Sequence, residues 1–273
     1  MPELEELAGL EPVARAKRII ELLTHHQDTV AELSRLRRDA INQLINQGMT
    51  HREVGELLGI ARARVGQILK EGPQPERVLF GTGPLIIAVG SKPEAQPSRA
   101  TPSDMITTEM SKAASIVADT ARVYGLDSTL EVVPQPGIVD MNRPNLVVIG
   151  SPKVLPVVSQ ALAADNHLGF ACCARGWYLT EGDQKYRSPS DSGKDADYAY
   201  IGRLPRPDTK GTFLYLAGIH RMGTVGAAKF LADNLPDLYA EVRNRRWSVL
   251  IECWYDPDTR EIQGTRPITP LYL

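Results

Sequence analysis

Apolar residues recur at helical spacing in the first part of the chain and form short continuous runs after residue 84. In residues 13–24 and 29–47 they follow the three- and four-residue spacing of one face of an amphipathic helix. The positions that form these stripes are Ile19, Ile20, Leu22, Leu23, Val30, Leu33, Leu36, Ile41, Leu44 and Ile45. The pattern predicts a hairpin of two helices, which either mediates dimerisation or covers the core of the helices that follow.

The polar residues between these two stretches predict a turn. Asp28 and Thr29 stand where the second helix should begin, and His25 and His26 fall on the turn itself. Because no second pair of ligands accompanies the two histidines, the sequence predicts no metal site there.

Residues 49–69, MTHREVGELLGIARARVGQIL, predict two short helices that meet at a tight turn. Thr50 with Glu53 three residues later is the pattern of a capping box. Gly59 supplies the left-handed residue that ends the first helix. The inward positions are Val54, Leu57, Leu58, Val65, Ile68 and Leu69. Two such helices joined by a turn that contains glycine form a helix-turn-helix.

The outward positions of this segment suit duplex DNA. Early positions of the second helix reach base edges, where arginine pairs with guanine and glutamine with adenine. The candidates on that helix are Arg62, Ala63, Arg64, Gln67 and Lys70. The start of the first helix is expected to contact phosphates, because helix N-termini attract anions. Its candidates are Thr50, His51 and Arg52.

Over about residues 38–71, with the core pattern QGMTHREVGELLGIARARVGQI, the chain resembles the helix-turn-helix of sigma-factor region four and of many bacterial transcriptional regulators. Two glycines depart from the usual pattern. Gly55 stands where many such motifs carry alanine, and Gly66 lies inside the recognition helix, where glycine costs roughly 1 kcal/mol relative to alanine. The resemblance implies a DNA-binding regulator. The alternative is a plain helical hairpin within a core.

Charge is concentrated around this motif. Residues 35–70 hold seven basic and three acidic residues, a net of +4, whereas the whole chain has a net charge of −2. Affinity for DNA scales with the number of phosphates neutralised, so a single small module binds weakly. We therefore expect a homodimer or a higher homo-oligomer that contacts paired half-sites.

Composition divides the chain into a helical DNA-binding domain at residues 1–71, a proline-containing linker at residues 72–77 and a second domain at residues 78–273. In the second domain three apolar runs end in glycine: LIIAVG at 85–90, NLVVIG at 145–150 and TFLYLAG at 212–218. Such runs, alternating with helical stretches, are typical of a buried, mostly parallel sheet. The fold class expected is α + α/β, with a loosely Rossmann-like second domain. Residues 169–203 predict short antiparallel strands, either a hairpin-rich insertion or a sheet edge, and residues 188–196 predict a loop.

Ligands of open α/β sheets bind beyond the carboxyl ends of parallel strands. Free backbone N–H groups and basic side chains at these ends favour a small anion, which we expect to be a nucleotide or another phosphate or carboxylate. The alternative is that the glycines form ordinary strand-to-helix turns. The candidate residues are Gly90, Ser91, Lys92, Gly150, Ser151, Lys153, Gly218, His220, Arg221, Gly223 and Thr224.

Three functions stay open: a DNA-binding regulator that senses a ligand, an enzyme or defence-type effector acting on a nucleoside or nucleotide, and a structural DNA-binding scaffold. In an enzyme His220 would be the general base, with Asp104, Glu109, Asp140 or Asp197 as its partner. No cofactor-binding or metal-binding pattern is present, and Cys172, Cys173 and Cys253 form no disulfide framework. With no apolar run long enough for a membrane span and no secretory signal, a cytoplasmic protein is expected.

Overall fold

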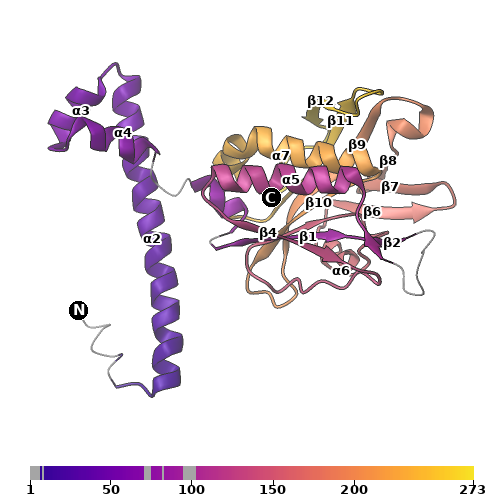
Figure 1. The fold of residues 1–273 in the computed structure, drawn as a ribbon, viewed down its shortest axis with the longest axis horizontal. Helices are drawn as coiled ribbons and strands as arrows, with labels where there is room; N and C mark the ends of the chain where they lie inside the picture. The colour runs from indigo at the N-terminus through magenta and orange to yellow at the C-terminus, as the bar shows by residue number, and fades with distance from the viewer. Residues whose placement is uncertain (1–6, 8, 71–74, 82, 95–102) are drawn as a thin grey trace. The chain divides into compact units, whose positions relative to one another are not determined.

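The computed structural model describes residues 7, 9–70, 75–81, 83–94 and 103–273 (Figure 1). The chain divides into two compact units, Met1–Pro75 and Glu76–Leu273. Residues 71–74, which belong to or border the predicted linker, lie outside the described residues.

In its described residues from 9 onward, the N-terminal unit contains α2 (Pro12–Asn46), α3 (His51–Leu58) and α4 (Arg62–Lys70). The predicted turn at His25 and His26 is wrong, because α2 is one continuous helix of 35 residues. The polar residues there leave every backbone N–H available, and no proline or glycine follows Pro12 before Gly48, so nothing interrupts the helical hydrogen bonds. The side chains of the two histidines lie outside the described residues.

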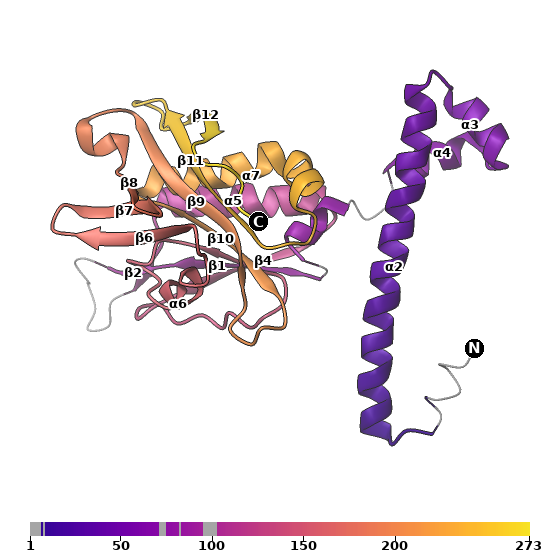
Figure 2. The same ribbon diagram turned by 180° about the vertical axis from the view of Figure 1, so that it is seen from behind.

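A small apolar core joins the three helices. Ile41 of α2, Val54 of α3 and Val65 and Ile68 of α4 are buried together. Partly buried side chains complete this core: Leu44, Ile45, Met49, Ile60 and Leu69. The last turns of α2 therefore hold α3 and α4, and the rest of α2 extends away from them (Figure 2). Leu57 and Leu58, predicted to face inward, are exposed.

The second unit is an α/β domain. Its helices are η1 (Pro75–Leu79), α5 (Thr108–Val123), α6 (Val158–Leu162), η2 (Pro189–Ser192) and α7 (Arg221–Val242). Its strands are β1 (Leu85–Gly90), β2 (Lys92–Pro93), β3 (Asp104–Met105), β4 (Ser128–Val133), β5 (Leu146–Ile149), β6 (Leu168–Cys173), β7 (Gly176–Glu181), β8 (Gln184–Tyr186), β9 (Ala196–Pro205), β10 (Thr212–Gly218), β11 (Trp247–Tyr255) and β12 (Ile262–Pro267).

Seven strands form one mixed sheet in the order β12-β11-β9-β10-β5-β1-β4. The pairs β1–β4, β1–β5 and β10–β5 are parallel. The three predicted glycine-ending runs thus lie on adjacent parallel strands, as expected. The pairs β10–β9, β11–β9 and β11–β12 are antiparallel, so the sheet is mixed and not mostly parallel. β9 runs opposite to β10 because a short turn, closed by the hydrogen bond from Arg206 N–H to the carbonyl of Gly211 at 2.9 Å, joins the two strands as a hairpin.

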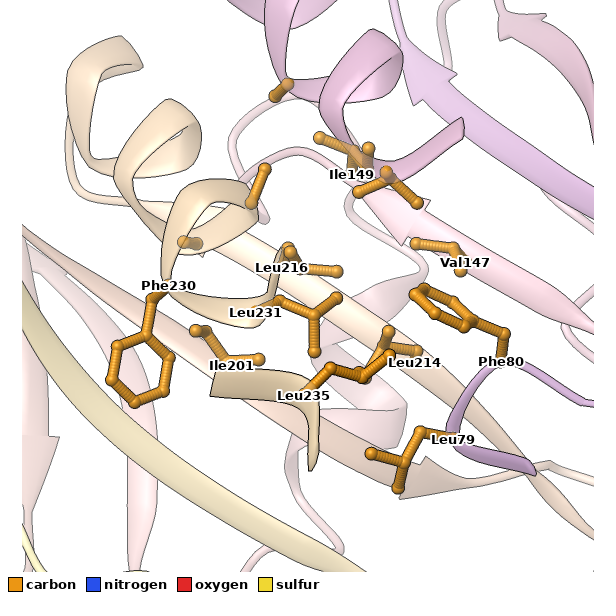
Figure 3. Close-up of a cluster of buried hydrophobic side chains, with 14 of the residues drawn as sticks. Leu79, Phe80, Val147, Ile149, Ile201, Leu214, Leu216, Phe230, Leu231 and Leu235 are labelled. Atoms are coloured by element: carbon orange, nitrogen blue, oxygen red, sulfur yellow. The ribbon is translucent and has the colours of Figure 1, made fainter. Parts of the chain in front are cut away.

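Both faces of the sheet are covered. Helices α5 and α7 lie side by side over one face (Figures 1 and 2). Figure 3 shows part of the core beneath them, where Leu214 and Leu216 of β10 meet Leu231 and Leu235 of α7. On the opposite face α6 and the small sheet β6-β7-β8 enclose a second core. Strands buried on both faces explain the continuous apolar runs.

Several local expectations change in the structure. Of the helical stretches expected after the apolar runs, the one after β5 is only the five-residue α6, whereas the one after β10 is the 22-residue α7. β9, expected in the hairpin-rich stretch, is an internal strand of the main sheet. The predicted loop at residues 188–196 contains η2 and begins at the buried Ser188.

Candidate nucleic-acid interface

The turn between α2 and α3 is fixed by the predicted capping box. The hydroxyl of Thr50 accepts the backbone N–H of Glu53 at 3.3 Å, and the Glu53 carboxylate accepts the backbone N–H of Thr50 at 2.7 Å. These two bonds satisfy N–H groups that a helix start leaves without partners. The backbone hydrogen bond from Thr50, followed by the bond from its hydroxyl, holds the pKa of Glu53 below its ordinary value.

Two glycines set the crossing of α3 and α4. Gly59 ends α3 in the left-handed conformation with φ of 66°, as predicted. Gly55 is buried, and a Cβ there would lie 2.7 Å from the carbonyl oxygen of Ile60. The departure from the usual alanine therefore has a structural reason, since the turn approaches α3 too closely for a methyl group.

α4 has a buried stripe with exposed residues on both sides of it. Val65 and Ile68 are 0 % and 5 % exposed and anchor the helix to the core. The four predicted base-contacting residues, Arg62, Ala63, Arg64 and Gln67, are all exposed. Arg64 donates from Nη1 to Oε1 of Gln67 at 3.3 Å, so these two side chains share one surface. The side chain of Lys70, at the end of α4, lies outside the described residues.

The predicted phosphate contacts stand at the start of α3. Thr50, His51 and Arg52 are exposed. Arg52 pairs with Glu56 at 2.9 Å, with side chains 79 % and 65 % exposed. A pair this exposed contributes little to stability, so the guanidinium can exchange its partner for a phosphate at small cost.

Comparison with models of known families, with curated proteins and with solved structures finds no match. The function is therefore argued from this geometry.

The predicted ligand-binding residues gather at one edge of the sheet, because β1, β5 and β10 are parallel neighbours. Packing occupies much of that edge. A Cβ on Gly90 would meet Val154 at 2.7 Å and Leu155 at 2.9 Å, and one on Gly150 would meet Leu155 at 3.3 Å. These glycines thus make room for the apolar segment that covers the ends of β1 and β5.

The residues around Gly90 and Gly150 are held within the protein. The buried hydroxyl of Ser91 donates at 3.1 Å both to Asp104 and to the carbonyl of Val133. The carbonyl of Gly150 accepts the hydroxyl of Tyr215 at 2.9 Å. Ser151 is half-buried, whereas Lys92 and Lys153 are exposed.

The N-terminus of α7 is capped by a carboxylate from a different strand. Asp197 of β9 is 1 % exposed and accepts the backbone N–H groups of His220 at 2.9 Å and of Gly223 at 2.8 Å. Ser188 donates to the same carboxylate at 2.6 Å. Burial raises the pKa of Asp197, and these hydrogen bonds oppose the rise. The first turn of α7 thus already holds a carboxylate in the position that a bound anion would take.

The other predicted ligand-binding residues near the start of α7 differ in their burial and contacts. Thr224 accepts the backbone N–H of Gly218 through its hydroxyl at 2.9 Å, and both residues are buried. Arg221 and His220 are exposed. The ring of His220 lies 2.7 Å, through Nε2, from Oδ1 of Asp191. Asp191, which lies on η2, is not among the partners expected from the sequence.

A shallow hollow of about 370 Å³ borders the end of β5, between α6 and the β6–β7 hairpin. None of the predicted ligand-binding residues lines it; its lining includes Pro152, Asp165, His167 and Phe170. Within the described residues no three His, Cys, Asp or Glu side chains are grouped to hold a metal ion. No helix in that same part of the chain has the length and apolarity to cross a membrane.

Proposed function

We propose that this chain is a sequence-specific DNA-binding transcriptional regulator that presents α4 to the major groove. The observation that carries the proposal is that Val65 and Ile68 anchor α4 to the core, whereas Arg62, Arg64 and Gln67 of the same helix are exposed. An anchored helix gives the reading side chains fixed directions, which base discrimination requires.

Each part of the motif has a separate role in this mechanism. Thr50, His51 and Arg52, at the start of α3, contact the DNA phosphates and set the register of the module on the duplex. Arg62 and Arg64 then donate to guanine O6 and N7, and Gln67 pairs with adenine. Because Arg64 bonds Gln67 in the free protein, the two side chains exchange a mutual hydrogen bond for bonds to bases.

For the α/β unit we propose a regulatory role, in which a small anion binds at the exposed basic groups Lys92, Lys153 and Arg221 near the strand ends. The capping of α7 by Asp197 directs an anion to these side chains and away from the helix N-terminus. A thermal-shift series with phosphate and nucleotides, repeated on a variant with all three residues changed to alanine, tests this role. Stabilisation of the wild type alone supports it, and equal or absent shifts count against it.

Selection of duplexes from a random library by the full chain tests DNA binding. We expect an enriched sequence motif, and Arg62→Ala and Arg64→Ala should each weaken binding to it by about 5- to 150-fold, which corresponds to about 1–3 kcal/mol per base contact. Arg122→Ala, an exposed arginine of α5, is the matched control and should bind as the wild type does. Absence of an enriched motif, or equal losses on all sequences, would refute base reading by α4.

A further inference from the structure

A repeat of eleven residues runs along α2. The apolar pairs Ile19 with Leu22, Val30 with Leu33 and Ile41 with Leu44 follow each other at this spacing. Eleven residues make three turns at about 3.67 residues per turn, close to the 3.6 of a straight helix. The three pairs therefore form one straight stripe along the helix.

Within the described residues of the N-terminal unit, Ile41 is the one fully buried residue of the stripe, and Leu22 and Leu44 are partly buried. Ile41 is 1 % exposed and packs with Leu44 in the core that holds α3 and α4. Val30 and Leu33 are each 60 % exposed, and Ile19 is 37 % exposed. The stripe that builds the helix-turn-helix core thus continues along α2 through the exposed Val30 and Leu33.

We propose that this stripe pairs in parallel with α2 of a second copy of the chain, forming a two-stranded helical dimer. Most of the stability of a helix in a protein comes from the packing of its apolar face, so the exposed part of the stripe favours a partner surface. A stripe with a regular repeat fits an identical stripe, since the pair Val30 with Leu33, and likewise the pair Ile19 with Leu22, then meets the same pair across a two-fold axis. The helix carries six basic and four acidic residues with mixed signs, which suits self-pairing better than a surface of a single charge.

The parallel direction rests on the proposed function. In an antiparallel pair centred on the exposed part of the stripe, near residue 26, the two Leu44 positions would lie about 54 Å apart, at about 1.5 Å per residue. This separation fits neither one helical turn of DNA, about 34 Å, nor two. In a parallel pair the helix axes lie about 8–10 Å apart, and both helix-turn-helix modules stand at the same end. Two α4 helices on opposite sides of the axis can then enter successive major grooves.

Sedimentation of the full chain tests the pairing. The wild type should be a dimer, and Val30→Glu with Leu33→Glu should be a monomer, because both side chains are exposed in the single chain and their loss affects only the pair. Ala14→Glu with Lys17→Glu is the matched control: both residues are exposed, lie on the opposite side of α2 and have the same spacing. The control should remain a dimer. A monomeric wild type, or a dimeric Val30/Leu33 variant, would overturn the proposal.

Cross-linking tests the direction. With the exposed Cys172 and Cys173 changed to serine, Val30→Cys should form a disulfide-linked dimer under mild oxidation, whereas Lys17→Cys should not. A dimer in sedimentation that fails to cross-link at Val30 overturns the parallel arrangement. A dimer that cross-links but selects no DNA sequence keeps the pairing and removes the proposed function, so the two failures are distinguishable.

Discussion

Oδ2 of Asp197 accepts the backbone N–H of His220 at 2.9 Å, which joins β9 to the residue that caps α7. The same oxygen accepts the N–H of Gly223 at 2.8 Å, and a Cβ on Gly223 would lie only 2.6 Å from the carbonyl oxygen of Tyr198. Strand and helix are therefore locked together by one buried carboxylate and one glycine. The contact stabilises the strand-end loops and occupies the helix N-terminus.

The first prediction concerns this cap. Asp197→Asn should lower the free energy of unfolding of the α/β unit by about 3 kcal/mol, because one amide NH₂ would face backbone donors in a buried site. Denaturant unfolding of the full chain measures the loss. Asp191→Asn is the control. The side chains of His220 and Asp191 are 48 % and 41 % exposed, so losing this pair should lower the free energy of unfolding by less than about 1 kcal/mol. Similar losses in both variants would contradict the role of Asp197.

The glycines of the helix-turn-helix should respond differently to alanine. At Gly66 a Cβ meets nothing within 4 Å, so Gly66→Ala should stabilise α4 by roughly 1 kcal/mol. Gly55→Ala should destabilise the module, since its Cβ would lie 2.7 Å from the carbonyl oxygen of Ile60. Thermal unfolding followed by circular dichroism measures both. A destabilising Gly66→Ala would show that α4 is not an open helix at that position.

The capping box predicts a pH dependence. The folded-state pKa of Glu53 lies below its ordinary value of 4.5, so its stabilisation is fully present above that value and is lost as pH falls through the lowered folded pKa. Glu53→Gln should therefore lower the melting temperature of the helical unit near neutral pH, and the difference from wild type should shrink below about pH 4.5. A difference that does not change with pH would count against an ionised cap.

Cysteine reactivity provides a further prediction. Arg187 donates from Nη2 to Sγ of Cys173 at 3.1 Å, and this bond is the main cause that lowers the pKa of the exposed thiol. Burial raises the pKa of Cys253 to about 12. In native protein near neutral pH, iodoacetamide should modify Cys173 faster than Cys172 and leave Cys253 unmodified, as mass spectrometry would show. Arg187→Ala should remove the advantage of Cys173, and unchanged rates would refute the effect of the guanidinium.

Short-range features of this protein followed from the sequence. The capping box at Thr50, the left-handed Gly59 and the buried face of α4 depend on residues within a few positions of each other, so their chemistry is visible in the chain. The buried strands β1, β5 and β10 were predictable for a similar reason, because strands covered on both faces need continuous apolar runs. The sequence predicts a turn within α2 because the middle of this helix is polar, as turns are. The helix continues there because no proline or glycine interrupts its backbone hydrogen bonds.

Long-range features were decided by the tertiary structure alone. β9 pairs with β10 across a short turn, but its pairing with β11 on the other side joins strands separated by α7, and no local pattern encodes that second pairing. The cap of α7 by Asp197 and the covering of Gly90 by Leu155 join residues far apart in sequence. Local hydrogen bonding and hydrophobic spacing are written in neighbouring residues, whereas a buried charge finds its donors only after the elements that carry them have packed.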